Sequence, residues 1–168
     1  MKPLRNVLVT LLLILHGCYP TFNWRTVQTE HFGWEVLFPA KPKRDSRKIN
    51  IVYQSEEKVV FVNRYSAVLN EMNFVIDVMS FEKAVRETDI PLQEYLNKAL
   101  RRNFNIPDNV RVVDGVKLYG YINLKEKKPV IIIVKHLKNS NSLVRGAVIA
   151  PPEKFKKDEA NFFLESIR

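Results

Sequence analysis

The sequence predicts an α+β fold, in which a mostly antiparallel sheet of about six to seven strands carries a mid-chain helix and a C-terminal helix packed on it. Three patterns predict this: short segments of alternating apolar and polar residues, turn-forming residues between them, and two stretches with apolar residues at helical spacing. The chain has 168 residues, 46% of them hydrophobic. That is enough for one domain with a core but short for two, so residues 32–168 should form a single α+β domain.

Four strands are expected before the first helix. Their apolar residues alternate, and they lie at residues 32–38, 49–53, 59–69 and 74–78. Pro39 ends the first strand, because proline cannot extend a hydrogen-bonded ladder. Residues 41–45 indicate a turn and residues 54–58 a polar connection, whereas residues 70–73 join the last two strands into a long hairpin.

The mid-chain helix is predicted from helical spacing and from its ends. Asp89 and Pro91 open the segment, and the apolar residues that follow are Leu92, Tyr95, Leu96, Ala99, Leu100 and Phe104. Glu94 lies near the start and Arg101 and Arg102 near the end, where the helix dipole favours them.

Further strands and a final helix are expected beyond residue 109. Asp114-Gly115 indicates a two-residue turn between the apolar segments 110–113 and 116–119. Residues 130–134 are apolar on both faces, which indicates an interior strand rather than an edge strand. After a turn at residues 139–142 the last strand covers residues 143–149, and Pro151-Pro152 ends it. The final helix buries Ala160, Phe163, Leu164 and Ile167.

The first 17 residues have the layout of an export signal. Lys2 and Arg5 precede an apolar run at residues 7–15 that only Thr10 interrupts. Nine helical residues span about 14 Å, whereas the hydrocarbon core of a bilayer is about 30 Å thick. The run is therefore expected to direct export and not to span the membrane.

The residues after this run, Leu15-His16-Gly17-Cys18, resemble the lipobox of bacterial lipoprotein precursors. Leu15, Gly17 and Cys18 match the family pattern, and His16 stands where a small or aliphatic residue is usual. The resemblance implies cleavage between Gly17 and Cys18, attachment of diacylglycerol to the Cys18 thiol and acylation of the new amino terminus. Cys18 is the only cysteine in the chain, so no disulfide forms within one molecule.

Lipidation would make residues 18–31 the lipidated cysteine and a tether, and two or three acyl chains would hold the protein on a membrane. In lipoproteins of two-membrane bacteria, an Asp after the cysteine usually retains the protein on the inner membrane. Tyr19 stands there, which favours the periplasmic face of the outer membrane. Within the tether, Phe22 and Trp24 are expected to dock on the domain, with the lipid headgroup zone as the alternative.

Two short segments, residues 32–39 and 160–167, together with the order of the expected elements resemble the PsbP/Mog1-like α/β/α sandwich group. Members of that group serve as accessory or binding modules. The resemblance therefore implies a binding role, and it brings no catalytic residue with it because the shared positions are core and turn positions.

Few residues suggest catalysis or metal binding. His31 and His136 are far apart and have no second His or Cys at metal-ligand spacing, so neither a structural zinc site nor a cofactor is expected. We expect His136 to be a partly buried, hydrogen-bonded strand residue and His31 to lie in a loop or at the start of a strand.

Asp77 alternates with Ile76 and Val78 and is expected to face solvent. Nucleophile-elbow, phosphate-loop and dinucleotide-binding motifs do not occur.

The excess of basic residues favours an anionic partner. The formal net charge is +9, and signal removal lowers it by two because Lys2 and Arg5 are lost. The candidate anion-binding cluster consists of Lys41, Lys43, Arg44, Arg47 and Lys48, with smaller basic groups at residues 125–128 and 154–157. The alternative is that these side chains are solvated and protect a sheet edge from aggregation. Nucleic acid is not expected as a partner, because export would separate the protein from it.

The sequence thus favours a lipid-anchored cell-envelope protein whose domain is a non-catalytic binding or accessory module. Its expected partners are the membrane, reached through the N-terminal lipid, and an anionic headgroup, an envelope polyanion or a protein. Two alternatives stay open. One is an envelope hydrolase with a shallow site near His31 or His136, and the other is a structural or assembly factor of the envelope.

Overall fold

The computed structural model describes residues 22–30, 33–53, 56–81, 92–122, 125–139 and 142–168. These residues form eight strands in two antiparallel sheets and two α-helices, which confirms the predicted α+β fold. The strands are β1 (Arg25–Gln28), β2 (Glu35–Phe38), β3 (Lys43–Tyr53), β4 (Glu56–Leu69), β5 (Met72–Phe81), β6 (Leu118–Ile122), β7 (Lys128–Lys138) and β8 (Ser142–Ala150). The helices are α2 (Leu92–Asn103) and α3 (Lys157–Glu165), and a short 3₁₀ helix, η1 (Pro152–Lys154), precedes α3.

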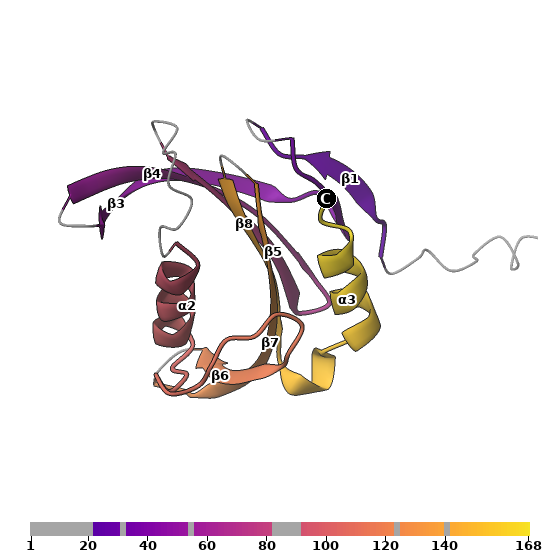
Figure 1. The fold of residues 1–168 in the computed structure, drawn as a ribbon. Helices are drawn as coiled ribbons and strands as arrows, with labels where there is room; N and C mark the ends of the chain where they lie inside the picture. Colours follow the sequence, from indigo (N-terminus) through magenta and orange to yellow (C-terminus); the bar gives the residue numbers. More distant parts are fainter. Residues whose placement is uncertain (1–21, 31–32, 54–55, 82–91, 123–124, 140–141) are drawn as a thin grey trace, which may run out of the picture.

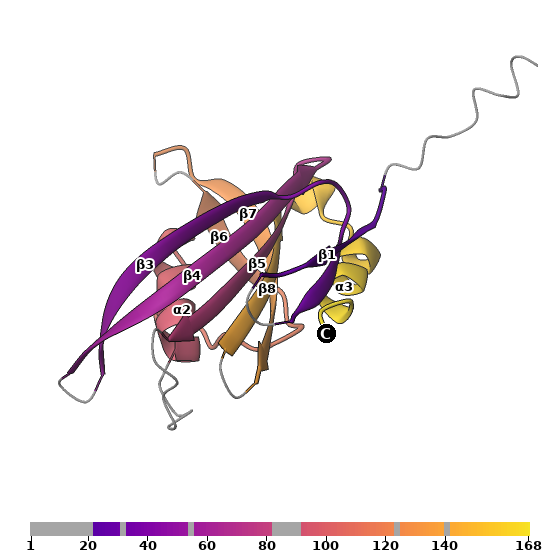
Figure 2. The same ribbon diagram turned by 90° about the horizontal axis from the view of Figure 1, so that it is seen from above.

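Six strands form the main sheet in the order β3-β4-β5-β8-β7-β6, so that β3 and β6 are its edges. Figure 1 shows the sheet curving around α2, with α3 and the β1–β2 pair on the opposite face. Figure 2 shows the same three layers from above, with β1 beside α3. The domain is thus a sandwich with the main sheet in the middle.

Each face of the main sheet has its own core. On the α3 face, Phe163 of α3 packs against Phe38 and Phe74, with ring centroids 5.2 and 5.3 Å apart respectively. On the α2 face, Leu92 and Leu96 pack on Met79, and Leu100 packs on Ile132 of β7. The two helices therefore bury both faces of the central strands, as the continuous apolar runs of β7 and β8 require.

The small sheet joins the two ends of the described chain. β1 pairs with β2 from Arg25 opposite Phe38 to Gln28 opposite Glu35. The backbone N–H of Glu35 donates to the carbonyl of the last residue, Arg168, at 2.7 Å, and the N–H of Arg168 donates back at 3.0 Å. Residues 22–30, which the sequence assigns to the tether, therefore include a strand of the folded unit.

Several expected elements are confirmed. The β4–β5 hairpin turns at Asn70 and Glu71, whose positive φ angles of 50° and 63° are those of a tight hairpin turn. β7 lies between β6 and β8 and is buried over residues 130–134, as expected of an interior strand. The apolar stripe of the final helix is buried.

Three expectations about loops are wrong. Residues 43–45, expected in a turn, begin β3, because they pair with residues 64–66 of the long strand β4. Residues 56–58, expected in the polar connection, begin β4 and pair with residues 51–53 of β3. Residues 110–113, expected to lead through the Asp114-Gly115 turn into a strand, form no strand, and pairing with β7 starts only at Leu118. Instead, Val110 and Val112 pack against the α2-side core, so this segment covers the sheet.

Candidate functional site

A row of charged and polar side chains crosses the α2 face of the main sheet. Strand register places Asp45 opposite Arg64, Arg64 opposite Asp77, Asp77 opposite Arg145, and Arg145 opposite His136. Residues directly opposite in an antiparallel pair point to the same side, with Cβ atoms about 4.5–5.5 Å apart. We call these five residues the charge row. Its signs alternate from Asp45 to Arg145, so each strand carries a charge opposite to that of its neighbour.

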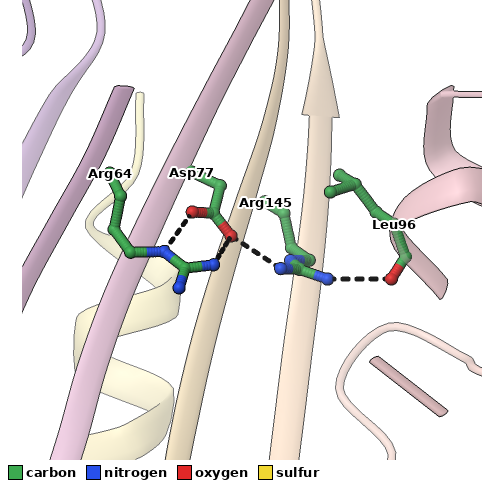
Figure 3. Close-up of polar contacts among 4 residues, drawn as sticks. All are labelled: Arg64, Asp77, Leu96 and Arg145. Atoms are coloured by element: carbon green, nitrogen blue, oxygen red, sulfur yellow. Dashed lines mark hydrogen bonds and ion pairs between the residues drawn. The ribbon is translucent and has the colours of Figure 1, made fainter. Parts of the chain in front are cut away.

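Asp77 is the centre of the row, and its side chain is only 1% exposed. Arg64 donates from Nε to Oδ1 at 2.7 Å and from Nη2 to Oδ2 at 3.1 Å. Arg145 donates from Nη2 to Oδ2 at 2.6 Å. Figure 3 shows the carboxylate between the two guanidinium groups. Both carboxylate oxygens are therefore engaged in charge-assisted hydrogen bonds.

These contacts set the ionisation state of Asp77. Burial by itself would raise the pKa of the carboxyl, but the charges and hydrogen bonds of Arg145 and Arg64 outweigh burial and hold the pKa below its ordinary value. The hydrogen bond to Asp77 in turn raises the pKa of Arg64, against the effect of burial. Asp77 is thus a buried anion at neutral pH and is poorly suited to transfer protons.

The expectation that Asp77 faces solvent is wrong. Alternation does place it on the face opposite Ile76 and Val78, but α2 covers that face too, and Val75 and Met79 beside it are buried. The sequence held one signal of this: Arg145 lies in the middle of an apolar strand, and a buried arginine needs a carboxylate.

Arg145 joins the row to α2. Its side chain is 8% exposed, and Nη1 donates to the carbonyl of Leu96 in the middle of the helix at 3.0 Å (Figure 3). On the other face, Lys135 donates from Nζ to the carbonyl of Leu164, near the end of α3, at 3.0 Å. Each helix is therefore tied to the main sheet by a cation that hydrogen-bonds a helix carbonyl.

Five fully buried side-chain polar atoms have no hydrogen-bond partner among the described residues, and three of them belong to the Arg145 end of the charge row and the helix above it. These three are Arg145 Nε, Asn97 Oδ1 and His136 Nε2. Asn97 follows Leu96 in α2, and His136 lies opposite Arg145. Because all three atoms are buried, solvent does not reach this end of the charge row, which α2 covers.

His136 confirms the expectation of a buried, hydrogen-bonded strand histidine. Its side chain is 4% exposed, and its Nδ1 lies 2.6 Å from Oδ1 of Asp114. The backbone N–H of His136 donates to the other Asp114 oxygen at 2.9 Å, and Gly115 N–H donates to the carbonyl of Val134 at 2.9 Å. The Asp114-Gly115 turn thus docks on β7. A general base would need Nε2 to face a substrate, but that atom is buried.

The predicted anion-binding cluster lies along the edge strand β3. Register places Lys43 and Arg47 on the α2 side and Arg44 and Lys48 on the α3 side, while Lys41 precedes the strand. Arg44 forms an ion pair with Glu30 and lies 5.9 Å from the centroid of the Tyr65 ring, and the Lys48 ammonium lies 4.7 Å from that of Phe61. The five residues share one edge but are divided between its two faces.

The N-terminal aromatic residues dock on the domain, as expected. Phe22 stacks on Trp24 with ring centroids 5.7 Å apart, and both rings meet Phe74 edge-on at 6.3 and 6.1 Å. Trp24 also contacts Phe162 of α3, with centroids 4.7 Å apart, and the Lys156 ammonium lies 5.3 Å from the centre of the Phe22 ring. This contact joins the start of the described chain to α3.

Other predicted site residues lie outside the described residues: Gly17 and Cys18 of the lipobox, and His31. Within the described ranges, no cluster of three or more His, Cys, Asp or Glu is arranged to hold a metal ion. None of the helices in this part of the chain has the length and apolar composition needed to cross a membrane.

Comparisons of the chain with family models, with curated proteins and with solved structures gave no significant match.

Proposed function

We propose that this chain is a lipid-anchored protein of the bacterial cell envelope whose folded domain is a non-catalytic binding or accessory module. The observation that carries the proposal is Leu15-His16-Gly17-Cys18, which follows a basic and apolar leader and contains the only cysteine of the chain. The resemblance of the domain to the PsbP/Mog1-like group supports an accessory role. Tyr19 after the cysteine favours the outer membrane as its location.

The position of the first described residue supports an anchor close to the domain. Phe22 already packs on Trp24 and Phe74. An extended chain rises by at most about 3.6 Å per residue, so the four steps from Cys18 to Phe22 cover at most about 14 Å. A lipid on Cys18 would therefore keep the domain at the membrane surface.

The distribution of charge favours binding over catalysis. The central charges of the buried row, Arg64, Asp77 and Arg145, are paired with one another, and His136 presents no accessible Nε2. By contrast, the lysines and arginines of β3 are exposed along an edge of the sheet. An anionic headgroup, an envelope polyanion or an acidic protein surface would complement this edge.

Replacing Cys18 tests the anchor. In a two-membrane bacterium, the full-length chain should incorporate a fatty-acid probe and fractionate with the outer membrane. Cys18→Ala should abolish labelling and leave an uncleaved precursor, because the thiol is the site of lipid attachment. Tyr19→Asp is the matched control, which should stay labelled but shift to the inner membrane. Undiminished labelling of Cys18→Ala would refute the proposal.

A further inference from the structure

Three aromatic side chains form a continuous exposed or half-exposed group where the chain enters the domain. They are Phe22, Trp24 and Phe162, and we call them the aromatic surface. Phe162 is 47% exposed although it lies in α3 next to the fully buried Phe163. Trp24 contacts both Phe22 and Phe162, so the three rings adjoin. One exposed ring beside two half-buried rings forms an apolar group that is partly open to solvent, which indicates an interaction surface.

The chain itself indicates what this surface meets. The aromatic surface begins at Phe22, four residues after Cys18. Under the proposed function, on which this inference rests, the lipid would hold these rings within about 14 Å of the bilayer. Such a short tether gives the aromatic surface a high effective concentration at the bilayer. Even a weak affinity of the rings for lipid is then enough for docking.

Local charge does not drive the docking. Lys156 extends over the Phe22 ring, but Lys154 pairs with Glu71 at 3.1 Å, and Asp158 and Glu159 occupy the first turn of α3. Side chains of both signs therefore lie in this part of the chain, three lysines before α3 or at its start and two carboxylates in its first turn. The attraction must come from the aromatic rings, which partition favourably into the headgroup zone of a bilayer.

We propose that the aromatic surface of Phe22, Trp24 and Phe162 inserts into the headgroup zone of the membrane that carries the anchor. The domain then rests on the membrane with the face of α3 that carries Phe162. Both this contact and the orientation it imposes are independent of salt, because they depend on apolar partition and not on net charge.

The chain carries its own reporters for this orientation. Its two tryptophans are Trp24 and Trp34. Trp24 packs on Phe74 near the start of β5, whereas Trp34 donates from Nε1 to Ser142 at 2.8 Å, and Ser142 lies opposite Ser80 near the end of β5. Six residues of strand separate Phe74 from Ser80, which is about 20 Å. The two indoles thus mark opposite ends of the domain.

The test uses the protein without residues 1–17, whose Cys18 thiol is coupled to a lipid with a maleimide headgroup. The vesicles consist of phosphatidylethanolamine and phosphatidylglycerol. Part of the lipid is brominated on the acyl chain close to the headgroup, because bromine quenches tryptophan at that depth. In Trp34→Phe, which leaves Trp24, we expect emission to fall about twofold relative to unbrominated vesicles, at low and high salt alike. In Trp24→Phe, which leaves Trp34, emission should not change.

A second pair of variants keeps both tryptophans. Phe162→Ser should remove most of the quenching, whereas Val52→Ser, at a 75% exposed residue on the far part of β3, should leave it unchanged. Equal quenching of both tryptophans, or the absence of quenching of Trp24, would overturn the proposed docking. The aromatic surface would then be a candidate contact for a protein partner instead. Because the anchor is supplied chemically, this failure is distinct from failure of fatty-acid labelling at Cys18.

Discussion

At the scale of single residues, Asp77 stands out because its buried carboxylate holds two arginines of neighbouring strands. Its carboxylate is buried between Arg64 and Arg145, and Arg145 connects it to the carbonyl of Leu96 in α2. A buried ion pair adds little net stability relative to apolar residues. Removal of one partner, however, leaves the other charge buried without a counter-charge. We infer that the charge row fixes where α2 lies on the sheet.

Asp77→Asn should therefore be strongly destabilising. It leaves the buried Arg145 guanidinium without a counter-charge, which costs about 3–5 kcal/mol of unfolding free energy. Urea titration followed by circular dichroism measures the change. Asp108→Asn is the matched control, because the Asp108 side chain is fully exposed, and it should change stability by less than about 0.5 kcal/mol. Equal stability of the two variants would show that the row is dispensable.

The pKa of Asp77 predicts how stability depends on pH. The pKa is lower in the folded than in the unfolded chain, where it is about 3.9, so the folded state favours the ionised carboxylate. This contribution is complete above the unfolded-state pKa and is lost as the pH falls through the folded-state pKa. Wild-type unfolding free energy should thus fall as the pH is lowered below about 4.5. In Asp77→Asn the acid slope should be shallower, and parallel slopes would contradict the assignment.

At the scale of elements, the packing of α3 depends on a missing side chain in β8. A Cβ at Gly146 would clash with Cδ1 of Ile167 and would lie 2.9 Å from Cδ2 of Leu164. Gly146 therefore allows α3 and Ile167, two residues beyond its end, to approach the sheet closely. Gly120 has the same role on the other face, where a Cβ would lie 2.6 Å from the carbonyl oxygen of Phe104.

Gly146→Ala should destabilise the domain by about 1–3 kcal/mol, because the new methyl overpacks the α3 interface. Ile167→Val removes the methyl group that would clash most closely. The double variant Gly146→Ala/Ile167→Val should accordingly be more stable than the sum of the two single changes predicts, by about 1 kcal/mol in a double-mutant cycle of thermal or urea unfolding. If the effects of the two changes on the unfolding free energy were strictly additive, the new methyl group would not clash with Ile167.

The elements that the sequence predicts well are those with local signals. Alternation and turn residues located β2, the β4–β5 hairpin, β7 and β8, and helical spacing located α2 and α3. The expected turn at residues 43–45 and the expected strand at residues 110–113 failed for a non-local reason. Residues 43–45 are polar, yet β4 is long enough to pair with them, and Val110 and Val112 pack against the core on the α2 face instead of extending the sheet.

The candidate site was less predictable. The sequence identified His136 as a hydrogen-bonded strand residue, but its partner Asp114 lies 22 residues away in a turn. The solvent-facing expectation for Asp77 failed because alternation specifies which residues share a face and not whether a distant helix covers that face. The charge row depends on the register of five strands, which no local pattern specifies.

At the scale of the whole molecule, the domain has three layers (Figure 1), and we propose that a lipid at Cys18 anchors it. Signal removal would lower the net charge of +9 by only two, so the proposed mature protein stays basic next to a membrane. The exposed basic residues lie on the edge strand β3, and the aromatic surface lies beside the point where the chain leaves for Cys18. In this proposal the anchor and the aromatic rings lie at the membrane, and the basic edge is a separate surface for an anionic partner.

Mass spectrometry of the amino-terminal peptide from membrane-purified protein would show whether Cys18 carries the lipid. We expect the mature chain to begin at Cys18 and this peptide to carry a diacylglycerol thioether together with an acylated amino group. A free Cys18 thiol, or a mature chain that still contains residues 1–17, would contradict this expectation.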